Sequence, residues 1–187
     1  TTADDGTQDN CLIRIDTEEG ISGRGEADSA PTVVKAIVDA PLSHQLANGL
    51  ANALEGADPL DRDECSRRMD QAFFWYGRVG VGVHAMAGID VALWDIAGKV
   101  AGLPIHQLLG NCRSEVPAYS STAWHPTVEE FAEEAKYFQS MGWTAHKVHP
   151  AGDPRKDIEI ATAVRKAVGD DMILMLDSMW AYGYEDA

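Results

Sequence analysis

Short apolar runs alternate with longer segments of helical periodicity in the second half of the chain. The runs at 117–121, 143–148 and 172–177 are typical of strands. Between them, apolar residues recur every three or four positions over 127–141 and 153–168, which predicts two amphipathic helices. Nearly apolar strands separated by such helices indicate a parallel sheet covered by helices.

Capping signals support both predicted helices. Thr127 and Glu130 form a capping box, Asp153 followed by Pro154 is typical of a helix start, and a glycine follows each helix. The residues predicted to face the core are Val128, Phe131, Ala135, Phe138 and Met141 in the first helix, and Ile158, Ala161, Val164 and Val168 in the second.

The first half of the chain has a different pattern. Residues 11–26 predict a β-hairpin, because two alternating apolar stretches flank a Glu-Glu-Gly turn. Helical patterns are broken over 32–76 and clear over 83–101, where Gly102 follows the end. The residues predicted to share one face of this last helix are Ile89, Ala92, Leu93, Ile96 and Val100. The sequence therefore predicts a separate α+β unit, with a boundary near residue 113.

Composition and charge limit the classes of partner. Of the 187 residues, 45% are hydrophobic, which is enough for a buried core. No run of about 18 apolar residues occurs, so no membrane span is predicted. The formal net charge of -15 argues against a nucleic-acid partner, since phosphate binding needs patches of Lys and Arg. The acidic surface fits two alternatives equally, a protein of a high-salt cytoplasm and an ordinary acidic protein.

The cysteines favour a reducing compartment. Cys11, Cys65 and Cys112 are far apart and odd in number, which predicts neither a disulfide framework nor a cysteine metal cluster. The chain begins with polar and acidic residues that do not resemble a signal peptide, and its first residue is not Met. We therefore expect a cytoplasmic protein.

Titratable side chains stand at the ends of two predicted strands. Lys147 and His149 are two positions apart, so they point to the same face of a strand. Asp177 ends the next strand. By spacing alone, a strand that simply ends near solvent is the commoner explanation of the pair, and a strand-end Asp is most often a helix cap.

One helical stretch carries a family resemblance. Residues 85–110 read AMAGIDVALWDIAGKVAGLPIHQLLG and resemble the mandelate racemase and muconate lactonizing enzyme branch of the enolase superfamily. The matching positions are Ala85, Gly88, Ile89, Asp90, Ala92, Trp94, Asp95, Gly98, Lys99, Pro104, Leu108, Leu109 and Gly110. The segments GRGEA at 23–27 and YGRVGVGVHA at 76–85 are also similar to the family.

The resemblance implies an α/β fold in two parts. Residues 1–113 would be an α+β capping domain that lacks its first strand. Residues 114–187 would be the first three βα units of a (β/α)₇β TIM-like barrel, which is incomplete here. We therefore expect a truncated chain, because so few parallel strands cannot close a barrel. Members of the family are usually homo-oligomers, and the resemblance implies the same here.

The resemblance also implies a chemistry. Asp177 matches the first of the family's acidic Mg²⁺ ligands, and Lys147 with His149 matches its acid/base pair, which is usually Lys-x-Lys. The expected reaction is Mg²⁺-dependent removal of the proton α to a carboxylate through an enediolate. Lys147 would stabilise charge, and His149 would transfer the proton, since imidazole titrates near neutral pH.

The substrate is expected to be a small-molecule carboxylate, a hydroxy or sugar acid. The first hypothesis is a sugar-acid dehydratase. The alternatives are a racemase or epimerase of a hydroxy acid and a non-catalytic truncated barrel, because the residues that decide between them would lie beyond Ala187.

Overall fold

The structure is a computed structural model that describes residues 9–43, 47–75, 77–122 and 124–186. The chain divides into two compact units, with Cys112 the last residue of the first and Arg113 the first residue of the second. Each unit has its own buried core. That the first unit is a capping domain and the second the opening of a barrel stays a prediction.

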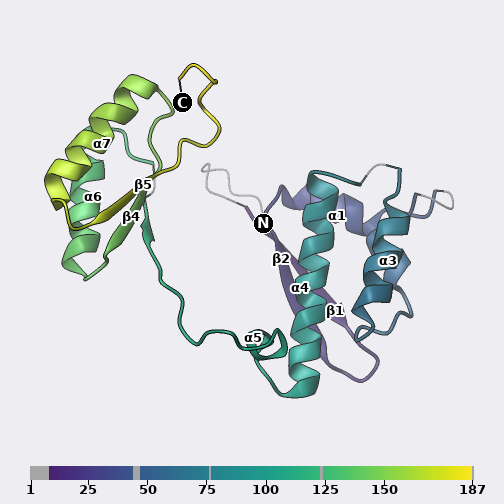
Figure 1. Cartoon of the computed structure of the whole chain (residues 1–187). Coiled ribbons are helices and arrows are strands. Elements are labelled where there is room, and N and C mark those ends of the chain that lie inside the picture. The colour runs from purple at the N-terminus through teal and green to yellow at the C-terminus, as the bar shows by residue number, and fades with distance from the viewer. Residues whose placement is uncertain (1–8, 44–46, 76, 123, 187) are drawn as a thin grey trace. The chain divides into compact units, whose positions relative to one another are not determined.

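The N-terminal unit is a hairpin packed against helices (Figure 1). Its elements are β1 (Cys11–Asp16), β2 (Ser22–Ala27), α1 (Pro31–Asp39), α2 (Leu50–Leu54), α3 (Arg62–Ala72), α4 (Val81–Ala101) and α5 (Ile105–Leu108). The two strands are antiparallel, with Cys11 opposite Ala27 and Asp16 opposite Ser22, which confirms the predicted hairpin. On α4, the other residues of the predicted face are buried, whereas Val100 is 49% exposed. It lies in the last turn of the helix, which ends at Ala101.

Strand β2 lies directly on the backbone of α4. A Cβ atom at Gly25 would lie 1.9 Å from the carbonyl oxygen of Gly88, and one at Gly23 would lie 2.0 Å from that of Ala92. Neither position has room for a side chain, because the obstructing atoms belong to the helix backbone. The Gly-x-Gly spacing in this strand is therefore a packing motif of the N-terminal unit.

Gly25→Ala is expected to lower the free energy of unfolding of the N-terminal unit by about 1–3 kcal/mol, the usual cost of overpacking. Urea denaturation followed by circular dichroism would measure it. Gly183→Ala is a matched control, because an added Cβ there would meet its nearest atom, an Asp186 carboxylate oxygen, only at 3.8 Å. A Gly25→Ala midpoint equal to that of the parent would contradict the close packing of β2 on α4.

Helix α4 is long and apolar enough to cross a membrane by length and composition alone. Core helices of soluble proteins meet the same criterion, and 44% of its apolar window is buried inside the fold. Its buried face includes Ala85, Ile89, Leu93 and Ile96, and the first three of these belong to the core of the N-terminal unit. The packing of α4 is thus that of a core helix, and the absence of a membrane partner stays a prediction.

The C-terminal unit is a parallel sheet with two helices. Its elements are β3 (Ser120–Ser121), α6 (Val128–Ser140), β4 (Ala145–Val148), α7 (Pro154–Val168) and β5 (Ile173–Leu176). The strands lie in the order β3-β4-β5, and both pairings are parallel. This confirms the parallel arrangement that the alternating pattern predicts, with strands shorter than expected.

The core of this unit lies between the helices and one face of the sheet. Its members are Phe131, Ala135, Val148, Ile160, Val164, Val168 and Met172. Two residues predicted to face the core are exposed, Ile158 at 67% and Met141 at 58%, so these two predictions are wrong. The buried stripe of α7 runs through Asp157, Ile160 and Val164, and Ile158 is one position off that stripe. Met141 is the C-cap of α6, past its last buried turn.

Candidate active site

The two faces of strand β4 differ: one is buried against the helices, and the other carries accessible titratable side chains. His146 and Val148 are buried, at 0% and 2% exposure, on the face that packs against the helices. Lys147 and His149 alternate with them and point to the other face, as the period of two requires. Their side chains are 21% and 27% exposed, which leaves both accessible to a small molecule.

Asp177 joins this pair from the neighbouring strand. Strand β5 pairs with β4 so that Lys147 lies opposite Met175, and the backbone N–H of Asp177 donates to the Val148 carbonyl at 2.9 Å. This register places the carboxylate next to both β4 side chains. Oδ2 of Asp177 lies 3.0 Å from Nζ of Lys147 and 3.3 Å from Nε2 of His149. Three residues that the sequence singled out thus meet at one oxygen atom.

Hydrogen bonding shifts the protonation of two of these groups. The hydrogen bond from Lys147 lowers the pKa of the Asp177 carboxyl, and the backbone N–H of Met179 adds to this by donating to Oδ1 at 3.2 Å. The same bond raises the pKa of Lys147, while partial burial opposes the rise. The ring of Tyr119, 5.5 Å from Nζ, also favours the charged amine. Lys147 is therefore a cation and Asp177 an anion at neutral pH.

Residues at the end of β3 and just after it contact the other ring nitrogen of His149. Nδ1 of His149 lies 3.0 Å from the backbone carbonyl oxygen of Thr122 and 3.4 Å from Oγ of Ser121. The Thr122 N–H in turn donates to the Lys147 carbonyl at 2.9 Å. Sequence reasoning missed both Thr122 and Tyr119. A backbone carbonyl has no residue-type signature, and Tyr119 stood inside a predicted strand with nothing to mark it.

A second histidine of β4 belongs to the core. His146 is fully buried, its Nδ1 lies 2.8 Å from Oγ of Ser120, and its Nε2 has no hydrogen-bond partner within the part of the chain that the structure describes. The ring also lies 5.7 Å from that of Phe138. Burial lowers the pKa of His146, and the nearby Glu134 carboxylate opposes part of this effect.

The buried His146 is expected to make stability depend on pH. Below its ordinary pKa of 6.5, an unfolded chain binds a proton at this position, whereas the folded chain resists it because its pKa is lower. The free energy of unfolding should therefore fall as the pH drops below 6.5 towards the folded pKa. Urea titrations at several pH values would give the free energy of unfolding as a function of pH. Below pH 6.5, this free energy should change less steeply with pH for His146→Gln than for the parent. Equal slopes would contradict the buried neutral imidazole.

Among the three side chains that meet at the strand ends, one is a suitable ligand for a divalent metal ion. Asp177 offers a carboxylate, and Mg²⁺ prefers oxygen ligands in octahedral geometry. No group of three His, Cys, Asp or Glu side chains that could hold a metal ion occurs within 9–43, 47–75, 77–122 and 124–186. The residues fit the role of a first Mg²⁺ ligand, and a complete site needs further oxygen ligands besides Asp177.

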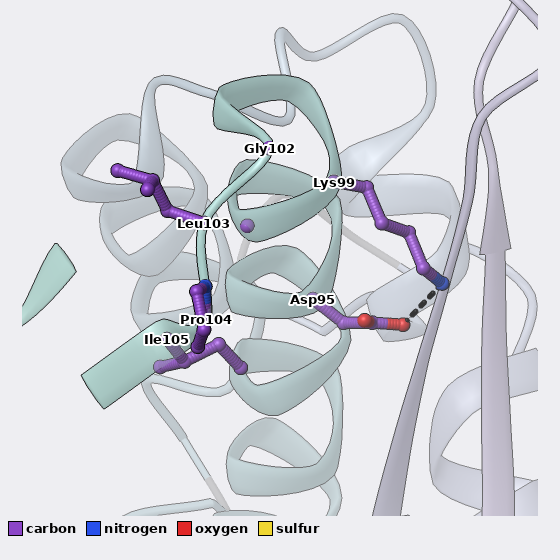
Figure 2. A pocket seen from close by; sticks show the side chains of 7 residues that line it. Asp95, Lys99, Gly102, Leu103, Pro104 and Ile105 are labelled. Carbon is purple, nitrogen blue, oxygen red and sulfur yellow. Dashed lines mark hydrogen bonds and ion pairs between the residues drawn. The ribbon is translucent and has the colours of Figure 1, made fainter. Parts of the chain in front are cut away.

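The N-terminal unit carries an open surface pocket of about 370 Å³ at the end of α4. Its polar groups serve the fold: Nζ of Lys99 donates to Asp95 at 2.6 Å and to the Ser22 carbonyl at 2.7 Å, and Arg24 N–H donates to Asp95 at 2.8 Å. Figure 2 shows this ion pair extending from α4, with Leu103 and the residues after it along the other wall. Asp95 and Lys99 therefore hold the hairpin to the helix.

Two family models match the chain, one in each of its two units. The family model described as mandelate racemase / muconate lactonizing enzyme, N-terminal domain, matches residues 2–110, and the enolase C-terminal domain-like model matches residues 130–187.

Similar proteins include enzymes of several reaction types. An arabinonate dehydratase of Saccharolobus solfataricus is 35% identical over 124 residues, which are 64% of this chain and 33% of that protein. A D-galactarolactone cycloisomerase of Agrobacterium fabrum is 30% identical over 181 residues, 94% of this chain and 46% of that protein. The crystal structure of a racemase from Streptomyces coelicolor A3(2) with bound magnesium matches 94% of this chain and 48% of that one, with a TM-score of 0.82 and 26% identity. The chain thus spans a third to a half of the length of these proteins.

Proposed function

The chain belongs to the mandelate racemase / muconate lactonizing enzyme family of the enolase superfamily, and from this we propose that it carries part of a site that removes the proton α to the carboxylate of a small hydroxy acid. The observation that supports this most is the meeting of Lys147, His149 and Asp177 where adjacent parallel strands end. Such carboxyl ends are where barrel enzymes place their catalytic groups.

The proposed reaction needs positive charge. A carboxylate substrate is already an anion, so removal of its α-proton leaves an enediolate with two negative charges. Preorganised cations stabilise such charge most effectively where water is scarce. Lys147 meets this requirement, because its raised pKa keeps the amine charged. Its ammonium group would pair with the substrate carboxylate.

His149 is proposed as the proton-transfer group. The bond between the α-carbon and its hydrogen breaks, the electron pair stays on the substrate, and the proton moves to the imidazole. The ring then carries the positive charge beside the Asp177 carboxylate, whose Oδ2 lies 3.3 Å from Nε2. The attraction between these opposite charges would stabilise the product of the transfer.

Asp177 is also proposed as a ligand of Mg²⁺. The match to a racemase whose crystal structure holds magnesium supports this assignment. When bound, Mg²⁺ would supply the larger part of the positive charge that the enediolate requires. Lys147 donates to the Asp177 carboxylate, and this contact would hold the proposed ligand in place at the end of β5.

We expect a dehydratase acting on a sugar acid, with a racemase or epimerase as the alternative. Similarity to an arabinonate dehydratase supports the first, and similarity to a racemase supports the second. In a dehydratase the β-hydroxyl leaves after proton removal, whereas in a racemase a proton returns to the opposite face. A small-molecule carboxylate as partner, a homo-oligomer and a cytoplasmic location are part of the same proposal.

The test is a screen of hydroxy and sugar acids with the complete protein and Mg²⁺ in D₂O. Proton NMR would follow loss of the α-proton signal, which reports abstraction even where later steps stall. A 2-keto product would identify a dehydratase, and deuterated acid of both configurations would identify a racemase. No exchange with any acid, in protein that is folded and binds Mg²⁺, would contradict the proposed function and favour a non-catalytic barrel.

Asp177→Asn is expected to weaken Mg²⁺ binding at least about tenfold, since a neutral amide replaces a charged oxygen ligand. Isothermal titration calorimetry of the complete protein would measure the affinity. Asp170→Asn is a suitable control, because Asp170 is exposed in the turn after α7. Unchanged Mg²⁺ affinity in Asp177→Asn would refute its assignment as a ligand.

A further inference from the structure

We propose that the buried carboxylate of Asp157 anchors Tyr182, and that this anchor holds a strained turn whose backbone positions the Asp177 carboxylate. The assignment rests on the proposed function, because it takes Asp177 as part of the site. Asp157 lies in the first turn of α7, whereas Tyr182 follows β5. Both are therefore positioning residues, which act on the site from outside it.

The turn directly after Asp177 has an unfavourable backbone conformation. Met179 and Trp180 have φ values of 50° and 62°, and the Ala181 N–H donates to the Ser178 carbonyl at 2.9 Å. Positive φ at both central residues is typical of a type I′ turn, which favours Asn and Gly. A Cβ atom makes this conformation costly for other residues. Burial of the side chains does not compensate, since Met179 is 57% exposed and Trp180 is 94% exposed.

The contact between Tyr182 and Asp157 can supply the compensation. The Tyr182 hydroxyl donates to Oδ2 of Asp157. Asp157 is 2% exposed, and its Oδ1 has no hydrogen-bond partner among the described residues. A buried carboxylate with an unpaired oxygen destabilises a fold, whereas an apolar side chain would pack there without this cost. Core packing alone therefore does not explain the acid, but a charged acceptor makes a strong hydrogen bond to Tyr182.

Further contacts connect the turn to the site. A Cβ atom at Gly152, in the loop between β4 and α7, would lie 2.7 Å from Cβ of Ala181, so the turn packs closely on this loop. At the start of the turn, the backbone N–H of Met179 donates to Oδ1 of Asp177 at 3.2 Å. The other oxygen of this carboxylate lies 3.0 Å from Nζ of Lys147. The orientation of the carboxylate thus depends on the turn as well as on Lys147.

Amide hydrogen exchange of the complete protein, read by NMR without metal or substrate, tests the anchor. In Tyr182→Phe the amides of Met179 and Ala181 should exchange roughly three- to tenfold faster, the loss that one net hydrogen bond produces. The Asp177 amide should keep its rate, because it donates to a carbonyl of β4. Unchanged exchange at both turn amides, or an equal increase at Asp177, would overturn the proposal. Tyr184→Phe is the matched control, since Tyr184 is 99% exposed, and an effect as large there would also overturn it.

A turn that is favourable by itself tests the role of the strain. Met179→Asn together with Trp180→Gly supplies the residue types that a type I′ turn prefers, so the turn should no longer need the anchor. Adding Tyr182→Phe to this pair should speed exchange of the Ala181 amide far less than Tyr182→Phe does alone. An equal increase in both backgrounds would show that the anchor does not act by holding a strained turn.

The link to Asp177 has a spectroscopic readout. The ¹³C signal of its side-chain carboxyl carbon, identified by its loss in Asp177→Asn, should move in Tyr182→Phe and stay in place in Tyr184→Phe. A signal that Tyr182→Phe leaves unmoved would overturn the positioning of the carboxylate. If the turn and this signal respond as expected but no acid exchanges its α-proton, the proposed function fails while the anchor stands.

Discussion

His149→Asn is expected to slow exchange of the substrate α-proton by at least about 10²-fold, the low end for loss of a general acid–base group. Asparagine keeps an amide N–H near the place of Nδ1, so the contact with the Thr122 carbonyl can persist. It has no titratable nitrogen to take the proton. Substrate binding should change little, because Lys147 still faces the carboxylate.

A second base on the opposite face of the substrate could exchange the proton in the variant. Exchange must therefore be followed by NMR for both configurations at the α-carbon, with the parent protein beside it. Loss of exchange for one configuration alone would assign His149 to that face. Full exchange and turnover with every acid that the parent accepts would show that His149 is not the acid/base group.

Much of the C-terminal unit could be predicted because its signals are local. Helical periodicity and caps depend on residues three or four apart, and both α6 and α7 begin within one residue of the predicted start. Strand ends were less predictable, since they depend on pairing. The predicted strand at 117–121 is reduced to Ser120–Ser121, because pairing with β4 begins only where Ser120 lies opposite His146.

The candidate site shows the same division between local and long-range information. Alternation along one strand was enough to place Lys147 and His149 on a common face. Lys147 and His149 converge on one carboxylate oxygen of Asp177. This depends on the register of β5 against β4, which neither strand specifies by itself. The contribution of Thr122 is a backbone atom, and no side-chain pattern could mark it.

Lys147→Met is expected to reduce both binding and turnover, in contrast to His149→Asn. Methionine has a similar length but no charge, so the substrate carboxylate loses a cation in the ground state and the enediolate loses it in the transition state. Loss of one such preorganised group usually lowers turnover by about 10²- to 10³-fold. Steady-state kinetics should show a raised KM together with a reduced kcat.

Removal of Lys147 also changes the resting site. Asp177 loses the hydrogen bond that lowers its pKa most and keeps the weaker one from the backbone N–H of Met179. Lys166→Met is the matched control, because Lys166 is exposed on α7 and the substitution removes the same charge from the chain. If Lys166→Met behaved like Lys147→Met, a general loss of positive charge would explain both, and no specific pairing with substrate would be needed. If Lys147→Met kept the KM and kcat of the parent, the ammonium group would serve only to hold Asp177 at the end of β5.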